Sequence, residues 1–397
     1  MIGRLRTLAS RPSTLVCAIG FWLILIQISI AASQIILSVV LALWLYNLAT
    51  DRLDFIRLPI DGALAAFIVS SLLSALFSFD PWVSMVDVKK LALFAVPYLV
   101  VSTIRRESTF ETLILLMIGV ADLTALLSLW QYFFGELGDI NHRLQGLMSH
   151  YMTFSGLLMG IGILASALLI FQGRRRILLS GSLLLILSVL ALGLTRSAWL
   201  GFFVAATLLL FLRDRRLLAV VPVLIFGAWL LVPPEVESRL LTFIRPDISG
   251  TDRYYMLQSA VKMCENHPLF GVGPDMVSLV YPIYVVEGAP QQENVHLHNN
   301  LAQIAAERGL PCLIAWVWLM VTLLYWASRA YRHSKGDGLR RSLAAGTLGV
   351  VAASLTAGLF EYNFGDSEFL MMFLFVVSIP FVLEQNRPQD AHNSEIR

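Results

Sequence analysis

The chain has 397 residues, of which 57% are hydrophobic and only 14% charged, whereas an ordinary soluble domain carries about 25% charged residues. Its 29 Lys and Arg residues nearly balance its 27 Asp and Glu residues, so the formal net charge is +2. This balance, with no basic run longer than 174–176, excludes a nucleic-acid-binding protein, which needs a basic face. The apolar residues lie in blocks too long for globular cores, and we therefore expect an integral membrane protein.

The first apolar block is long enough for two membrane crossings. Residues 12–50 contain neither a charged residue nor a histidine over 39 positions, and one crossing needs about 20 residues. Three arginines precede this block, and Ala31-Ala32-Ser33 fits a cleavage region, so the start of the chain resembles a signal peptide. We favour an uncleaved first span, because the apolar run continues directly into a second one.

Further apolar blocks follow along the chain, and in lipid each must satisfy its backbone amides internally, which favours helices. The sequence therefore predicts an all-α polytopic membrane protein with about twelve transmembrane helices. The predicted spans lie near 14–30, 33–49, 60–78, 88–104, 112–134, 152–171, 177–194, 197–212, 217–232, 310–327, 343–360 and 369–384.

The basic residues are unevenly distributed between the two sides of the membrane. With the N-terminus in the cytoplasm, 20 of the 29 Lys and Arg residues fall on the cytoplasmic side, as the positive-inside rule requires. An even number of spans then places both termini in the cytoplasm. We divide the chain into spans 1–9 (1–232), an outer loop domain (233–309), spans 10–12 (310–384) and a cytoplasmic tail (385–397).

The outer loop is far longer than a connection needs, and such loops are usually functional or disordered. Within it, Thr251-Asp252 can cap a helix that runs to about Asn266 and ends before Pro268. Asn299 or Asn300 can cap a second helix, which ends at Gly309 and leads back into the membrane. We therefore expect a partly helical loop domain on the outer side.

Two arginines near the outer membrane face are candidates for anion binding. Arg196 separates two apolar spans, and it serves either as an anchor to lipid headgroups or as a bidentate clamp for phosphate oxygens. Arg253 lies in the expected first turn of a loop helix, where a cation opposes the helix dipole. Either a bound anion or a neighbouring carboxylate such as Asp252 or Asp247 compensates this charge.

His298 stands at the N-terminal edge of the helix that returns to the membrane. The positive helix end favours a neutral imidazole, which suits a general base, and a structural cap is the alternative role. His296 lies two residues away, and the two imidazoles can share a face as metal ligands. The spacing supplies no third ligand, and the three cysteines form no zinc pattern, so we expect no metal.

Other polar residues carry weaker signals. Arg143, in the predicted outer segment 141–146, is a secondary anion candidate. Asp122, in the fifth predicted span, is either a proton-relay carboxylate or a hydrogen-bond partner of a neighbouring helix. The acidic pairs at 235/237 and 366/368 can hold a cation, although solvated loops often contain such pairs. The GVGP segment at 271–274 lacks a dinucleotide-binding pattern and predicts a turn.

Three local segments, in this order on the outer side, resemble the bacterial O-antigen ligases and the related O-antigen polymerases. The segment LTRSAWLG at 194–201 is similar to the family's outer turn with an essential arginine. The segments DRYY at 252–255 and HPLFGVGP at 267–274 resemble its loop opening with a second arginine. His298-Asn299 followed by Gly309 resembles the ligases' His-Asn motif. This sequence departs from that motif at Cys312, where the ligases usually have Gly, Thr or Tyr.

The resemblance implies an O-antigen ligase in the bacterial inner membrane, with its active site on the periplasmic face. It implies a glycan on undecaprenyl pyrophosphate as donor, a sugar hydroxyl of lipid A-core as acceptor, and no cofactor. Arg196 and Arg253 would bind the pyrophosphate and His298 would remove the acceptor proton, with Arg143 and His296 as secondary candidates. We expect a metal-independent inverting transfer, since the missing DxD motif suits a lipid-linked donor.

Several alternatives remain open at the sequence level. An O-antigen polymerase would use the same donor with a second lipid-linked glycan as acceptor, and a protein O-oligosaccharyltransferase is related but usually longer. A transporter or flippase would place ionisable groups at the membrane midplane, whereas most candidates here gather at the outer face. A purely structural membrane subunit has little use for Arg and His in a folded loop near the bilayer.

Overall fold

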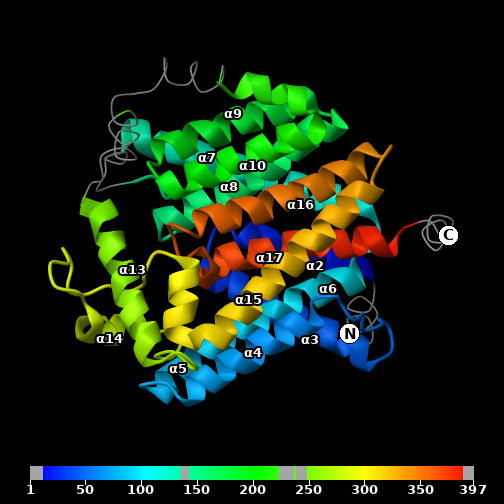
Figure 1. The fold of residues 1–397 in the computed structure, drawn as a ribbon. Coiled ribbons are helices and arrows are strands. Elements are labelled where there is room, and N and C mark those ends of the chain that lie inside the picture. Colours follow the sequence, from blue (N-terminus) through cyan, green and yellow to red (C-terminus); the bar gives the residue numbers. More distant parts are fainter. Residues whose placement is uncertain (1–11, 136–142, 223–236, 238–247, 388–397) are drawn as a thin grey trace.

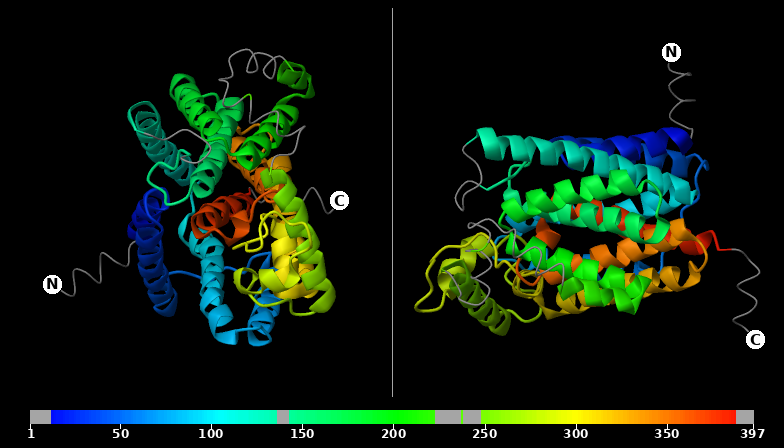
Figure 2. Two further views of the ribbon diagram at one scale, coloured as in Figure 1. Left: turned by 90° about the vertical axis from the view of Figure 1, so that its left-hand side faces the viewer. Right: turned by 90° about the horizontal axis from the view of Figure 1, so that it is seen from above.

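A computed structural model describes residues 12–135, 143–222, 237 and 248–387. Every regular element in these ranges is a helix, and most helices run roughly along one common direction (Figures 1 and 2). Three parts of the sequence prediction lie outside the described residues: most of the ninth span, Glu235 of the acidic pair 235/237, and the tail after Arg387. The all-helical architecture fits a polytopic membrane protein.

The N-terminal part of the chain forms the first group of helices. Its elements are α2 (Pro12–Leu25), α3 (Ile30–Ala49), α4 (Asp61–Leu76), α5 (Pro81–Asp87), the 3₁₀ helix η1 (Val88–Ala95), α6 (Val96–Thr103) and α7 (Glu107–Phe134). The fourth predicted span is wrong as one continuous helix. It is assembled from η1 and α6, with Pro97 near the start of α6, where a proline is compatible with a helix start but not with a helix interior.

The middle and C-terminal parts contain the remaining helices. These are α8 (Tyr151–Ala167) with a π-helical end η2 (Leu168–Gln172), α9 (Arg176–Leu192), α10 (Arg196–Arg213), η3 (Arg215–Ala219), α13 (Ile248–Asn266), α14 (Val277–Tyr284), α15 (Asn300–His333), α16 (Gly338–Ala357), η4 (Asn363–Gly365) and α17 (Ser367–Gln385). Among these, α17 is buried from Ser367 to Leu383 and runs through the middle of the bundle (Figure 1).

Six described helices are long and apolar enough to cross a membrane: Ile30–Ala49, Glu107–Phe134, Tyr151–Gln172, Arg196–Arg213, Asn300–His333 and Ser367–Gln385. Three shorter apolar helices, at Ser13–Leu25, Asp61–Leu76 and Arg176–Leu192, occupy other predicted spans. Apart from the fourth and the ninth, each predicted span coincides with a described helix. The total of twelve spans stays a prediction.

The helices α13 and α14 lie together at one end of the bundle (Figures 1 and 2). They share a small core of their own, in which Met256, Met263 and Val277 are buried. The described ends of the chain, at the start of α2 and the end of α17, lie at the opposite end of the bundle. This arrangement is the one expected if the loop domain and the termini are on opposite sides of a membrane.

The loop helices differ in detail from the sequence prediction. Because α13 begins at Ile248, Thr251 and Asp252 lie inside it and do not cap it. Arg253 consequently lies beyond the first turn, and its predicted position at the start of the dipole is wrong. The predicted cap at Asn299 is confirmed, since its side chain accepts a hydrogen bond from the amide of Ala302.

The helix α15 is broken at Gly309, as the expected helix end there predicts. Gly309 adopts φ 79° and ψ 170°, which is a backbone region accessible almost only to glycine. The break packs against the turn that follows α13: the amide of Val272 donates to the carbonyl of Ala306 at 2.9 Å, and that of Gly273 to Glu307 at 2.8 Å. The kink thereby joins the loop domain to the membrane helices.

We expect Gly309→Ala to lower the free energy of unfolding by about 3 kcal/mol, because the new Cβ requires a strained backbone. That Cβ would also lie 2.3 Å from the carbonyl oxygen of Leu269. Gly336→Ala is the matched control, since Gly336 has φ 87° but no atom near its built Cβ, and we expect a loss of about 1 kcal/mol. Thermal unfolding in detergent measures both, and equal losses would show that contact with Leu269 contributes nothing.

Candidate active site

Arg196 is presented by a tight turn between α9 and α10. The turn is fixed by three contacts: Ser155 Oγ donates to Thr195 Oγ1 at 3.0 Å, Thr195 Oγ1 donates to the carbonyl of Gly193 at 3.1 Å, and Trp199 Nε1 donates to the carbonyl of Leu190 at 2.6 Å. Arg196 is therefore the first residue of α10, with Thr195 at the cap position. The N-terminus of a helix carries partial positive charge, which adds to that of the guanidinium.

His298 lies in a short segment that is held against the connection between α16 and α17. Asn299 Nδ2 donates to the carbonyl of Leu359 at 2.9 Å, and the amide of Asn300 donates to the carbonyl of Gly358 at 2.7 Å. His298 itself adopts φ 48°, a left-handed conformation that is uncommon outside glycine. Such backbone strain is often found at functional sites, and here the neighbouring hydrogen bonds maintain it.

The structure brings Arg196, Arg253 and His298 together around one cavity of about 310 Å³, which we call the arginine cavity. They come from three separate segments: the start of α10, the helix α13 and the residue before the α15 cap. The complete lining is Arg196, Ser197, Leu200, Gly250, Arg253, Tyr254, Leu257, Leu297, His298, Asn299, Leu359 and Phe360. The cavity therefore combines two guanidinium groups and an imidazole with a largely apolar wall.

Glu361 joins this site, although the sequence analysis did not single it out. Its carboxylate lies 3.0 Å from His298 Nδ1 and 3.3 Å from His296 Nε2, and its side chain is only 12% exposed. Burial opposes the charged form, but the contacts with both histidines hold the pKa of Glu361 far below its ordinary value. An ionised carboxylate only accepts hydrogen bonds, so Nδ1 of His298 carries the proton in this contact.

Part of the chain matches a known protein family. Residues 181–317 match the family model described as O-antigen ligase. This segment of the chain is similar to the O-antigen ligase family. The resemblance seen in the sequence is thus confirmed, and the family supports a membrane enzyme of glycosyl transfer, of the O-antigen ligase or polymerase type. No curated protein sequence matches the chain.

The matched range contains some of the site residues but not all of them. The range 181–317 contains Arg196, Arg253 and His298. Glu361 lies beyond its end, and it reaches His298 only through a contact between residues 63 positions apart. No local pattern in the sequence distinguishes Glu361, because an acidic residue directly after an apolar span is common.

Two histidines and Glu361 also form an arrangement that could hold a metal ion. One ligand atom each from His296, His298 and Glu361 lie within 4.8 Å of one another. Three such ligands suffice for a catalytic zinc site, so the third ligand that the spacing did not supply comes from the fold. The same contacts are those of two imidazoles that donate hydrogen bonds to one carboxylate. Removal of metal separates the two arrangements by experiment.

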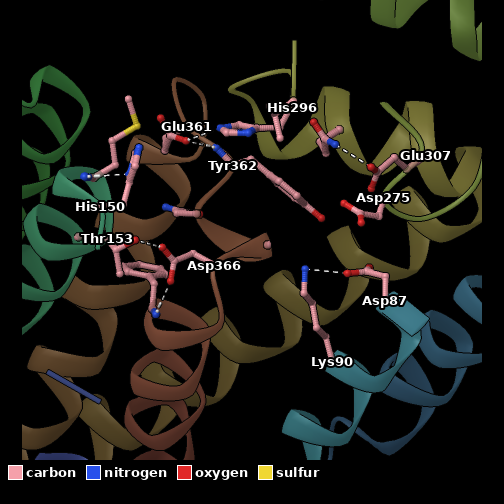
Figure 3. Close-up of a pocket in the computed structure, with 17 residues that line it drawn as sticks. Asp87, Lys90, His150, Thr153, Asp275, His296, Glu307, Glu361, Tyr362 and Asp366 are labelled. Atoms are coloured by element: carbon pink, nitrogen blue, oxygen red, sulfur yellow. Dashed lines mark hydrogen bonds and ion pairs between the residues drawn. The ribbon is translucent and has the colours of Figure 1, made fainter. Parts of the chain in front are cut away.

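A second cavity, of about 290 Å³, lies beside Glu361, and we call it the acidic cavity (Figure 3). Five carboxylates line it, whereas Lys90 is its single lysine or arginine among the described residues. Its complete lining is Asp87, Lys90, His150, Met152, Thr153, Gly156, Asp275, Val295, His296, Gln303, Glu307, Glu361, Tyr362, Asn363, Gly365, Asp366 and Phe369. The secondary candidate His296 thus belongs to this cavity and not to the arginine cavity.

The weaker candidates are placed away from the arginine cavity. The guanidinium carbon of Arg143 lies 4.5 Å from the ring centre of Tyr151, and Arg143 lines neither cavity. Asp122 accepts a hydrogen bond from Ser182 at 2.6 Å, which favours the second of its two predicted roles. Asp366 caps α17 by accepting from the amide of Phe369, and the segment 271–274 forms the predicted turn.

Proposed function

We propose that this protein is an O-antigen ligase, which transfers a glycan from undecaprenyl pyrophosphate to a sugar hydroxyl of lipid A-core. The observation that carries the proposal is the convergence of Arg196, Arg253 and His298 on one cavity. The protein resides in the bacterial inner membrane with both termini in the cytoplasm and the cavity on the periplasmic face. The excess of basic residues on the side of the termini supports this orientation.

The arginine cavity suits the head of a lipid-linked donor. Cleavage of the bond between the anomeric carbon and the pyrophosphate oxygen places negative charge on the leaving group. Arg196, Arg253 and the N-terminus of α10 all offer positive charge at this position. The apolar residues Leu200 and Leu257 line the same cavity and suit the first isoprenoid units.

His298 supplies the complementary proton transfer. The oxygen of the acceptor hydroxyl attacks the anomeric carbon, its proton passes to His298 Nε2, and undecaprenyl pyrophosphate leaves with the electrons of the broken bond. Glu361 fixes the required tautomer and stabilises the imidazolium that forms. A single displacement of this kind inverts the configuration at the anomeric carbon and requires no metal.

The test is transfer by purified protein, supplied with an undecaprenyl-pyrophosphate-linked glycan and rough lipopolysaccharide, with and without EDTA and 1,10-phenanthroline. We expect a glycosylated lipid A-core product of inverted configuration at an unchanged rate in the chelators. Retained configuration would contradict the single displacement. A rate that falls in the chelators and recovers with added metal would assign His296, His298 and Glu361 to a metal instead.

An O-antigen polymerase is the second candidate, because the matched family supports either type of transfer. A deletion strain distinguishes the two enzymes. Loss of all long-chain lipopolysaccharide with accumulated lipid-linked polymer indicates a ligase, whereas a core that bears one repeat unit indicates a polymerase.

A further inference from the structure

The acidic cavity is built by residues from distant parts of the chain. Asp87 and Lys90 come from the α5–η1 region, Asp275 from the turn before α14, Glu307 from α15, and Asp366 from the start of α17. In Figure 3 these side chains surround a common space, with Thr153 and Asp366 on one side and Asp275 and Lys90 on the other. A cavity of about 290 Å³ lies at the lower end of the size range of small-molecule sites.

Only one carboxylate separates the acidic cavity from the arginine cavity. His298 lines the arginine cavity and His296 lines the acidic cavity, while both imidazoles contact Glu361. The ring centres of the two histidines are 4.3 Å apart. A molecule in the acidic cavity therefore lies within one side chain of the proposed proton acceptor.

The carboxylates of the acidic cavity disfavour phosphate-bearing ligands, even though burial raises the pKa of Glu307 to about 7 and also raises that of Asp275. Asp87 is balanced by Lys90, whose Nζ lies 2.7 Å from it, and by Arg308, whose Nη2 lies 3.1 Å from it. The carboxylates of Asp275, Glu307 and Asp366 contact no lysine or arginine side chain within the described residues. An anionic group would be repelled here, whereas a neutral ligand would not.

The hydrogen-bonding groups of the cavity suit a molecule with many hydroxyls. No described residue donates a hydrogen bond to the Asp275 carboxylate, and Glu307 receives one from Gln303 Nε2 at 2.9 Å. Burial raises the pKa of Tyr362 to about 12, so that its hydroxyl remains a donor. Sugar hydroxyls both donate and accept, and they match this mixture of carboxylates, hydroxyls and amides.

We propose that the acidic cavity binds the uncharged terminal sugar of the acceptor, and that it selects against phosphorylated sugars. This inference rests on the proposed function and names the acceptor site of that reaction. The acceptor sugar then lies beside Glu361, and its hydroxyl extends past this carboxylate to Nε2 of His298, while the donor occupies the arginine cavity. The enzyme thus separates a cationic donor site from an anionic acceptor site.

Acceptor kinetics test the proposal with two isosteric variants from opposite sides of the cavity, Asp275→Asn and Thr153→Val. Asparagine tolerates the φ of 62° at position 275, so the backbone is preserved. With rough lipopolysaccharide as acceptor and saturating donor, we expect the acceptor KM to rise roughly tenfold in each. Asp275→Asn removes a charged acceptor of hydrogen bonds, and Thr153→Val removes the hydroxyl that donates to Asp366 and can accept from a sugar hydroxyl. The donor KM and kcat stay within twofold, and Glu287→Gln, an exposed acid outside both cavities, behaves like the parent.

The arginine variants separate a failure of this inference from a failure of the proposed function. If Arg196→Ala and Arg253→Ala lose turnover but Asp275→Asn and Thr153→Val keep the parental acceptor KM, the acceptor site lies elsewhere and only this inference falls. If the parent protein transfers no glycan at all, the proposed function fails, and direct binding then tests the cavity.

The binding experiment uses an octyl glucoside that carries a diazirine, cross-linked to the full-length protein in a sugar-free detergent. We expect cross-links at residues that line the acidic cavity, such as Met152 and Val295. Unlabelled octyl glucoside should compete, whereas octyl glucoside 6-phosphate at the same concentration should not. Cross-links confined to other surfaces, or equal competition by the phosphate, would overturn the assignment.

Discussion

Replacing either Arg196 or Arg253 by alanine is expected to lower kcat for glycan transfer about a hundredfold, because in the proposed reaction each guanidinium stabilises charge that develops on the leaving pyrophosphate. The loss should appear mainly in kcat and less in the donor KM, since the charge is greater in the transition state than in the bound donor. Initial rates at varied donor concentration measure both parameters.

Lysine variants at the same two positions refine this result. Arg196→Lys and Arg253→Lys keep the charge but lose the planar pair of donors, so we expect roughly a tenfold loss of kcat. Arg174→Ala is the control, because Arg174 is an exposed arginine in the turn between α8 and α9 and lines neither cavity. Turnover at the parental rate in both Arg196→Ala and Arg253→Ala would show that neither arginine takes part in the reaction.

The sequence predicted the helices well wherever apolar length decides the outcome. Long uncharged runs such as 12–50 leave few alternatives in lipid, and the cap at Asn299 and the break at Gly309 follow from local preferences of these residues. The start of α13 was misplaced, because Thr251 and Asp252 are good capping residues but are overridden when Ser249 and Gly250 join the helix. Local propensity cannot reveal such an extension, which depends on packing.

The sequence predicted the two arginines and His298 of the candidate site, but it did not predict Glu361 or the carboxylates of the acidic cavity. An arginine beside apolar spans is conspicuous, because a charge is costly near lipid and requires a reason to be there. Glu361 lacks such a signal, since acids are common where an outer loop begins, and its importance arises from a contact 63 residues away. The carboxylates of the acidic cavity are scattered from Asp87 to Asp366, and only the fold brings them together.

The break in α15 at Gly309 is stabilised by the turn that follows α13. The kink at Gly309 leaves backbone carbonyls of α15 without helical partners, and the amides of Val272 and Gly273 donate to those of Ala306 and Glu307. The same kink lies close in sequence to Glu307 and Arg308, which face Gln303 and Asp87.

His298→Asn is expected to lower kcat by about 100- to 10,000-fold, which is the usual contribution of a positioned general base. Asparagine is preferred to alanine because it tolerates the left-handed backbone at this position, so the fold of the segment is retained. Parental thermal stability and parental donor affinity would show that only the proton acceptor has been removed. If kcat is unchanged in this variant, another group removes the proton.

Glu361→Gln tests how His298 is held in the required tautomer. The amide has nearly the same size, but it lacks the charge that accepts hydrogen bonds from both imidazoles, and we expect roughly a tenfold loss of kcat. In the double variant with His298→Asn, the effect of Glu361→Gln on kcat should largely disappear, because a positioning residue has no role without the group it positions. Full additivity of the two losses would instead give Glu361 a role of its own, such as a direct contact with the acceptor in the acidic cavity.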